Sequence, residues 1–387
     1  MQRSFRKHNL KLGVFLSYRE PSEGGGFTIT EDILNSILTK STTKKIVFIT
    51  LNDHKNILKK KIKKAGFQCY SFYDSEYLIK FKNFIFSIFP SLLKIYNKFY
   101  FNNFLNFEKK KQIDLVWFIS AEYYFPLFSK YISTVWDLQH LTHSNFPESG
   151  SFLRRLYREF VIKNFLKNSH KIITGSKILI KLIIKNYDLS VDKFIYNNHP
   201  TPRVFIDSKS KLKKKYKYKN YFLYPANFWQ HKNHLNLFEG FERFNKKYKN
   251  KYKLILVGDV KDKKYYKRLK NKFHEDFDKN FIILNFIKLD FLIQLYDNCL
   301  ALIYSSFAGP ENLPPLEAMA RKKKIICSNY PGAKEQLKDI PIYFNPSNSD
   351  SIKSALERFI KRKNKKKFFI RNTDKYVSKV LSEINYD

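Results

Sequence analysis

Short apolar runs alternate with segments of helical pattern along most of this chain, and this alternation limits its fold more than any other feature. In the first half, helical patterns at residues 29–38, 151–168 and 177–186 separate such runs. Strands that alternate with helices are typical of parallel sheets covered by helices on both faces. We therefore predict an α/β fold with doubly wound parallel sheets. The predicted strands of this half are residues 12–17, 45–51, 67–72, 113–119, 132–136, 170–176 and 194–196.

The pattern stops in a polar, lysine-rich stretch and then restarts. The 387 residues exceed one core of typical size, which favours two domains of roughly 150 to 200 residues each. We predict an N-terminal domain at 1–203, a linker at 204–220 and a second α/β domain at 221–370. We expect residues 371–387 to form a helix that packs back on the N-terminal domain. The predicted strands of the second half are residues 221–226, 254–258, 281–286, 300–305, 324–328 and 341–344.

The formal net charge of +39 is compatible with nucleic acid, anionic membranes or phosphorylated substrates as partners. The lysines, however, are spread over the whole chain, as the runs at 59–64 and 365–367 illustrate. Such runs are usually solvated faces, and the composition also indicates a bias of the source genome. No nucleic-acid recognition motif accompanies them, so we expect no nucleic-acid partner.

The three cysteines, Cys69, Cys299 and Cys327, are widely spaced and odd in number. They predict neither a disulfide framework nor a zinc site, and they favour a reducing cytoplasm. The apolar stretch at 12–16 is too short for the core of a signal peptide.

The longest apolar region, residues 81–107, is interrupted by lysines and a proline. It falls short of the ~20 apolar residues that a spanning helix needs. Two interpretations stay open for it: helices packed on a sheet, or helices that lie in a membrane interface. The basic helices expected at 80–98 and 152–167 would allow peripheral contact with an anionic membrane, on the inner face of the cytoplasmic membrane, if the substrate is lipid-linked.

Residues 304–320, YSSFAGPENLPPLEAMA, combine a strand end, a glycine-containing loop and a helix entered through Pro314 and Pro315. Proline is tolerated in a first helical turn, because its missing N–H has no partner there. The free N–H groups of a helix N-terminus suit a phosphate. Glu317 would lie near the same ligand. The alternative is an ordinary connection between a strand and a helix.

The N-terminal half offers two further candidate positions after strand ends. Gly25 and Gly26, in a run of three glycines, would let a ligand approach the backbone, although a flexible surface turn has the same composition. Asp137, His140 and His143 follow the strand at 132–136. These residue types could bind a metal, but nothing in their spacing fixes a coordination set, and His143 is more simply a loop residue.

Several segments in one order resemble the retaining GT-B glycosyltransferases, a family that includes bacterial mannosyltransferases. The resemblance runs from about residue 12 to about residue 360. It implies two Rossmann-like domains that face a central cleft. It also implies transfer of a hexose from a nucleoside diphosphate sugar to a glycan or lipid-linked saccharide, with retention, in cell-surface polysaccharide synthesis. No metal and no cofactor beyond the sugar nucleotide is expected. The segments are GGG, TVWDLQHLTHSNFPE, HKIITGSKILIKLIIKNYDLSVDKF, NFWQHKNH, LVGDV, GPENLPPLEAMA and KKIICSNYPGAKEQL.

The resemblance also implies roles for individual residues. Lys232 falls where the family places a lysine on the donor diphosphate, although it could be one more solvated lysine. Glu317 matches the glutamate that hydrogen-bonds the nucleotide ribose. Lys232 and Asp137 are the implied catalytic residues, and the acceptor side is assigned to Trp136, His140 and His143. The implied donor-binding residues are Gly25, Gly26, Asn227, Lys232, Ile287, Gly309, Glu311, Asn312, Leu313, Pro314 and Glu317.

Three positions depart from the pattern of the family. Gly309 stands where the family has its first glutamate, with Glu311 close by but out of register. Asn227 replaces a frequent arginine, and Trp136 replaces a frequent histidine. These changes indicate a variant donor pocket. They also leave open a GT-B relative that does not transfer sugar, such as a sugar nucleotide epimerase.

Overall fold

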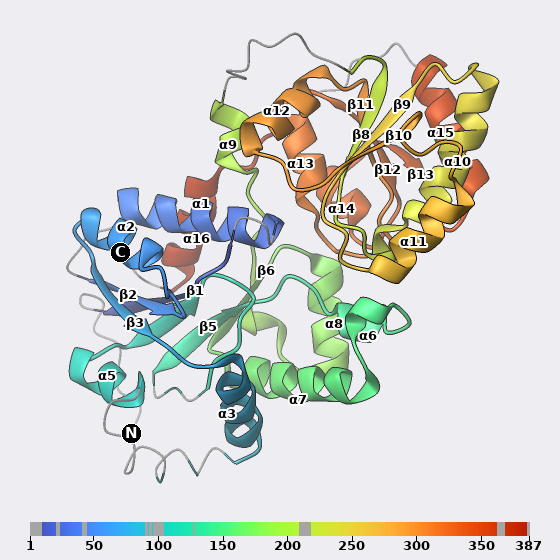
Figure 1. Ribbon diagram of the computed structural model, residues 1–387. Coiled ribbons are helices and arrows are strands. Elements are labelled where there is room, and N and C mark those ends of the chain that lie inside the picture. The colour runs from blue at the N-terminus through green and yellow to red at the C-terminus, as the bar shows by residue number, and fades with distance from the viewer. Residues whose placement is uncertain are drawn as a thin grey trace. The chain divides into compact units, whose positions relative to one another are not determined.

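The computed structural model describes residues 10–20, 24–40, 45–89, 92, 95, 104–125, 127, 129–208, 218–361 and 368–384. The chain divides into two compact units (Figure 1). The N-terminal unit comprises residues 1–141, 151–198 and 373–387, and the C-terminal unit comprises residues 142–150 and 199–372. Each unit is built on a parallel sheet, which confirms the predicted α/β class.

The sheet of the N-terminal unit has seven parallel strands in the order β3-β2-β1-β4-β5-β6-β7. Strand β1, inside the sheet, pairs on both sides, with Leu12 opposite Ile46 and Leu115. Strands β2 and β4 are buried along their whole length, as expected for apolar runs covered on both faces. The strands are β1 (Leu12–Ser17), β2 (Ile46–Leu51), β3 (Gln68–Phe72), β4 (Leu115–Phe118), β5 (Lys130–Thr134), β6 (Lys171–Thr174) and β7 (Phe194–Tyr196).

Local signals set the starts of several helices in this unit. Ser151 and Ser176 cap α7 and α8, and each hydroxyl accepts a hydrogen bond from the backbone N–H three residues later. The last helix, α16, packs against α1, and Ser36 of α1 donates a 2.6 Å hydrogen bond to Asp374. The helices are α1 (Gly25–Lys40), α2 (Ile57–Lys64), α3 (Glu76–Ile88), α5 (Phe104–Lys111), α6 (Gln139–Thr142), α7 (Phe152–Asn168), α8 (Lys177–Tyr187) and α16 (Thr373–Glu383).

The C-terminal unit has a six-stranded parallel sheet in the order β10-β9-β8-β11-β12-β13. Figure 1 shows α10 and α15 packed together on one face of this sheet and α12 and α13 on the other. The elements are α9 (Arg203–Asp207), β8 (Tyr221–Pro225), α10 (His234–Lys247), β9 (Lys253–Val257), α11 (Lys263–Lys272), β10 (Phe281–Leu284), α12 (Leu289–Asn298), β11 (Ala301–Tyr304), α13 (Leu313–Ala320), β12 (Lys324–Ser328), α14 (Ala333–Leu337), β13 (Ile342–Phe344) and α15 (Ser349–Lys361).

The topology of the C-terminal unit brings two distant segments of the chain together. The central strands β8 and β11 are neighbours and run parallel, with Leu302 opposite Leu223. Their carboxyl ends therefore lie at one edge of the sheet, where open α/β sheets bind their ligands. The segments that leave this edge, 226–232 and 305–312, contain five of the eleven predicted donor-binding residues.

Several predicted boundaries differ from the structure. The helix predicted at 29–38 begins at Gly25, so two of the three glycines lie in its first turn. Residues 142–150, expected in the N-terminal domain, group with the C-terminal unit. Much of the linker predicted at 204–220, and part of the apolar region at 81–107, lies outside the described residues. None of the described helices is long and apolar enough to cross a membrane.

Candidate functional site

Lys232 ends a short 3₁₀ turn (Gln230–Lys232) that follows β8. Backbone contacts hold this turn against the end of β11. The carbonyl oxygen of Lys232 accepts hydrogen bonds from the hydroxyls of Tyr224 and Ser305, and that of His231 accepts one from the Phe307 N–H at 2.8 Å. The backbone beneath the lysine is thus fixed by both central strands.

The side chain of Lys232 joins a chain of polar contacts. Its Nζ donates to the hydroxyl of Tyr304 at 3.2 Å, and that hydroxyl donates to Oδ1 of Asn312 at 2.7 Å. Burial raises the pKa of Tyr304 well above its usual value, so the phenol stays neutral. The contacts place the lysine cation near the residue that precedes the first turn of α13.

The N-terminus of α13 has fewer amide donors than the sequence suggested. Asn312 precedes the helix, and its N–H donates to Oε1 of Gln336 at 3.0 Å. Pro314 and Pro315 have no N–H. Within the described residues, Leu313 is therefore the position at which the first turn can offer an amide to an anion. Asn312 and Leu313 were both predicted to bind the donor, and of these two the backbone N–H of Leu313 is the one available to an anion.

Glu317 is buried in the second turn of α13. Its Oε2 accepts a 2.6 Å hydrogen bond from the hydroxyl of Tyr296, on α12. Burial raises the pKa of Glu317 to about 7, although the hydrogen bond from Tyr296 lowers it in part. A bound molecule with hydroxyl donors would favour the ionised carboxylate, as a ribose would in the predicted role.

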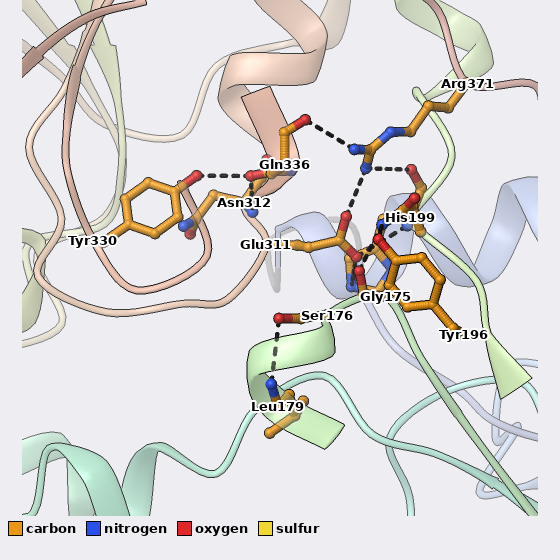
Figure 2. Close-up of polar contacts among 11 residues, drawn as sticks. Gly175, Ser176, Leu179, Tyr196, His199, Glu311, Asn312, Tyr330, Gln336 and Arg371 are labelled. Carbon is orange, nitrogen blue, oxygen red and sulfur yellow. Dashed lines mark hydrogen bonds and ion pairs between the residues drawn. The ribbon is translucent and has the colours of Figure 1, made fainter. Parts of the chain in front are cut away.

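Glu311 already binds two donors of the protein (Figure 2). Nη1 of Arg371 donates to its Oε1 at 2.6 Å, and the N–H of His199 donates to its Oε2 at 3.0 Å. Only 3% of the Glu311 side chain is exposed, and Nη2 of Arg371 also donates to the carbonyl oxygen of Gln336. These contacts make Glu311 an anchor of the loop at 309–312. They do not fit the predicted contact between Glu311 and a donor.

Gly309 has a conformation that excludes most side chains. Its φ is +110°, and a Cβ at this position would lie 2.7 Å from the side-chain nitrogen Nδ2 of Asn312. The backbone at Gly332 packs closely against the same loop, because a Cβ on Gly332 would lie 2.3 Å from the carbonyl oxygen of Pro310. The glycine at 309 is therefore required by the loop as built, and a glutamate there would have to displace Asn312.

Asn227 and Ile287 lie at other strand ends of the C-terminal unit. Oδ1 of Asn227, just past β8, accepts a hydrogen bond from the N–H of Asp259 at 2.8 Å. This contact ties the end of β8 to that of β9. Ile287 is half-buried after β10, next to the exposed Phe286. Its predicted contact with the nucleotide base stays a prediction.

The structure adds Glu148 and His231 to the surroundings of Lys232. Oε1 of Glu148 accepts a hydrogen bond from the His231 N–H at 2.7 Å and also contacts Nδ1 of the His231 ring. Phe146, from the same segment, packs on Phe307 with ring centroids 5.6 Å apart. No sequence signal marks the contact between Glu148 and His231, because 83 residues separate them. The segment 142–150 thus supports the turn that contains Lys232.

His143 lies in that same segment and is half-buried. Its Nδ1 lies 2.8 Å from Oγ1 of Thr142, and its ring stacks on Phe146. These contacts agree with a loop residue, and the predicted acceptor-side role of His143 stays a prediction.

In the N-terminal unit, the structure brings Gly26 and Trp136 together. A Cβ on Gly26 would lie 3.0 Å from the Trp136 ring, so a larger residue would push the ring away. Arg19 lies over the same ring and forms an ion pair with Glu122 at 3.2 Å. Gly25 is exposed at the start of α1. The glycine run and the segment after β5, distant in sequence, therefore form one local arrangement.

Asp137 and His140 follow β5 but differ in exposure. Asp137 is half-buried, and its Oδ1 accepts a hydrogen bond from the N–H of Gln139. The His140 side chain is 0% exposed, and its Nε2 lies 3.0 Å from Oε2 of Glu159, which also accepts from Tyr187. His140 is therefore a core residue, which contradicts the prediction that it faces an acceptor.

Across the described residues, no three histidine, cysteine or carboxylate side chains gather in a way that could hold a metal ion. The expectation of a metal-independent site stays a prediction.

Comparison with known proteins identifies similar sequences. Residues 205–376 match the family described as "Glycosyl transferases group 1". The chain is 28% identical over 235 residues to the O-antigen chain mannosyltransferase RfbU of Salmonella typhimurium. The alignment covers 60% of this chain and 61% of RfbU, so it spans about three fifths of that relative.

Solved structures show a similar fold. Anabaena Alr3699/HepE in complex with UDP-glucose has a TM-score of 0.64 at 13% identity, with 98% of this chain and 96% of that chain covered. The UDP-GlcNAc 2-epimerase of Methanocaldococcus jannaschii has a TM-score of 0.55 at 14% identity, with 98% and 100% covered. These similarities confirm the predicted GT-B fold.

Proposed function

We propose that the protein is a nucleotide-sugar-dependent glycosyltransferase, because residues 205–376 match the group 1 glycosyl transferases. It moves a hexose from a nucleoside diphosphate sugar to a saccharide or lipid-linked acceptor. The observation that carries the proposal is the polar arrangement at the carboxyl ends of β8 and β11. There Lys232 is held beside the N-terminus of α13 by Tyr304.

The chemistry of transfer gives each of these groups a task. Cleavage of the bond between sugar and phosphate leaves negative charge on the diphosphate. Lys232 and the N–H of Leu313 stabilise that charge as it develops, which lowers the barrier to transfer. Glu317 binds the ribose hydroxyls of the donor. Breakage with retention of the anomeric configuration is part of the proposal, as the resemblance to retaining enzymes implies.

The sugar and the pathway are inferred from RfbU. Its name specifies mannose and the O-antigen chain, and 28% identity over 235 residues supports a mannose-like hexose and a cell-surface polysaccharide here.

The state of the cysteines supports a proposal for the compartment. Cys69, Cys299 and Cys327 are buried free thiols. This state supports a reducing cytoplasm as the place of action.

The fold alone also fits an epimerase, because a UDP-GlcNAc 2-epimerase shares it. A single assay separates the two activities. The purified chain is incubated with a panel of UDP-sugars and GDP-sugars, with and without saccharide and lipid-linked saccharide acceptors. Products are analysed by mass spectrometry and NMR.

A transferase releases nucleoside diphosphate only when acceptor is present, and the new linkage has the anomeric configuration of the donor. Change of the donor sugar without acceptor would instead establish an epimerase and contradict the proposal.

A further inference from the structure

Two helices of the N-terminal unit expose an unusual share of large apolar side chains. Eighteen such side chains are exposed in the described part of the chain, and nine lie on α3, at its C-cap, or on α7. Monomeric soluble proteins rarely expose contiguous apolar patches of this kind without a function. We call these nine the α3–α7 apolar face: Tyr77, Leu78, Phe81, Phe84, Phe89, Phe152, Leu153, Leu156 and Phe160.

The face is continuous across the two helices, which lie side by side (Figure 1). The ring of Phe84 lies 6.1 Å from that of Phe160 and 6.3 Å from that of Tyr157. The hydroxyl of Tyr157 also donates a 3.0 Å hydrogen bond to the carbonyl oxygen of Lys80. Side chains spaced three or four residues apart, such as Phe81 and Phe84, share one side of a helix.

The exposed side chains are distinct from those that anchor the helices to the core. In α7 the buried residues are Val161, Ile162, Phe165 and Leu166, all in its second half, whereas the apolar face occupies the first half. In α3 a polar residue faces inward: Nδ2 of Asn83 donates to the carbonyl oxygen of Tyr123 at 2.7 Å. Core packing therefore does not explain the apolar residues on the outer sides.

The charge around the face is positive. Helix α7 has three arginines and two lysines but one acidic residue, Glu159. That carboxylate is engaged by His140 and Tyr187. Arg154 is exposed among the apolar residues of the first turn. A helix with exposed aromatic and leucine side chains next to arginines suits the boundary between headgroups and acyl chains.

We propose that the α3–α7 apolar face docks on the surface of an anionic phospholipid bilayer. The apolar side chains enter the outer part of the bilayer, and the arginines contact lipid phosphates. A net charge of +39 favours an anionic surface and opposes a second copy of this chain as the partner. The inference is independent of the proposed sugar transfer, since it concerns residues outside the candidate site.

The test is co-sedimentation of the full chain with vesicles of phosphatidylcholine alone or with three tenths phosphatidylglycerol. We expect strong binding only to the anionic vesicles. The double variant Phe81→Ser with Leu153→Ser should lose at least about tenfold in affinity. Its matched control is Ile178→Ser with Val191→Ser, two exposed apolar residues of the same unit outside the face. The control should bind like the wild type.

A second pair of variants tests the charges. Arg154→Gln with Arg158→Gln removes two cations worth about 1 kcal/mol each at an anionic surface, which corresponds to about 30-fold weaker binding. Lys181→Gln with Lys185→Gln, on α8, is the control with the same loss of charge. Thermal unfolding of every variant near the wild-type temperature confirms that the fold is intact.

Three results would overturn the proposal. One is equal binding of the wild type to neutral and anionic vesicles, or to neither. Another is wild-type binding by the Phe81→Ser and Leu153→Ser double variant. The third is a concentration-dependent dimer in sedimentation that this variant abolishes, which would make a second copy the partner.

Discussion

The ammonium nitrogen of Lys232 lies 3.2 Å from the hydroxyl oxygen of Tyr304, 72 residues later in the chain. The contact links the turn after β8 to the end of β11, and Tyr304 extends it to Asn312 at the start of α13. A cation is thus held where a helix N-terminus adds its own positive potential. Two sources of positive charge that are far apart in sequence meet at one edge of the sheet.

Lys232→Ala should slow sugar transfer by about 100-fold to 1,000-fold, because the charge that develops on the leaving diphosphate loses its countercharge. Binding of the nucleoside diphosphate should weaken much less. Steady-state kinetics separate the two effects. Lys264→Ala, an exposed lysine of α11, is the control and should act like the wild type. Unchanged turnover in Lys232→Ala would remove this residue from the mechanism.

Gly309→Ala should impair both stability and transfer, because the added Cβ meets the Asn312 side chain and disturbs its contact with Tyr304. Gly24→Ala is a suitable comparison, since Gly24 also has a positive φ, +83°, but has no atoms within 4 Å of a Cβ. Both variants carry backbone strain of about 1 kcal/mol. Gly309→Ala should unfold at a lower temperature than Gly24→Ala. Equal unfolding temperatures would show that the loop at 309–312 accommodates the added Cβ without loss of stability.

The close approach of Asn312 to position 309 also affects a glutamate placed there, the residue that the family has at this position. Gly309→Glu restores that residue type, but its Cβ would meet the Asn312 side chain and displace it. We expect weaker donor binding in this variant, measured by calorimetry. Tighter binding would show instead that the loop rearranges to a pocket typical of the family.

Glu317 should make stability depend on pH. Its folded pKa, about 7, lies above the ordinary value of 4.5, so between these values the folded state keeps a proton that the unfolded state releases. Its contribution to stability is therefore full below about pH 4.5 and is lost as pH rises through 7. The wild type should therefore lose stability relative to Glu317→Gln as pH rises from 4.5 to 8. The difference between their free energies of unfolding should change by up to about 3 kcal/mol over this range.

Urea unfolding of both proteins across this pH range measures the effect. The exposed Glu275→Gln serves as control and should follow the wild-type curve. Parallel curves for Glu317→Gln and the wild type would contradict the raised pKa.

Gly26 and Trp136 should be coupled, because a Cβ on the glycine meets the tryptophan ring at 3.0 Å. Gly26→Ala should lower stability, because the added methyl group crowds the tryptophan ring. In a Trp136→Ala background the same substitution should have a smaller effect on stability, since the ring is gone. A double-mutant cycle measures this coupling, and strictly additive effects would count against a direct contact.

The alternation of apolar runs and helical segments predicted both sheets, because buried parallel strands need continuous apolar sequence. The basic helix α11 was not predicted. Only its residues Tyr265 and Leu269 are buried, which is too few for a clear helical pattern of apolar residues. The helix start at Gly25 was missed for a related reason, since glycines usually mark turns.

The candidate site was predictable only in part. Lys232 and Glu317 stand in recognisable segments, and the structure gives each a defined polar partner. The partner of His231, by contrast, comes from a segment 83 residues earlier, and only the tertiary structure reveals it. The sequence position of His140 predicted a residue that faces a ligand, but in the structure its side chain is buried and contacts Glu159.

Calorimetric titration of UDP and GDP into the wild type and Glu317→Ala tests the donor site most directly. We predict that at least one of the two nucleotides binds the wild type and that Glu317→Ala weakens its affinity by at least about tenfold, as loss of hydrogen bonds to a charged group would. Absence of binding to the wild type, or equal affinity in the two proteins, would contradict the assignment of this site.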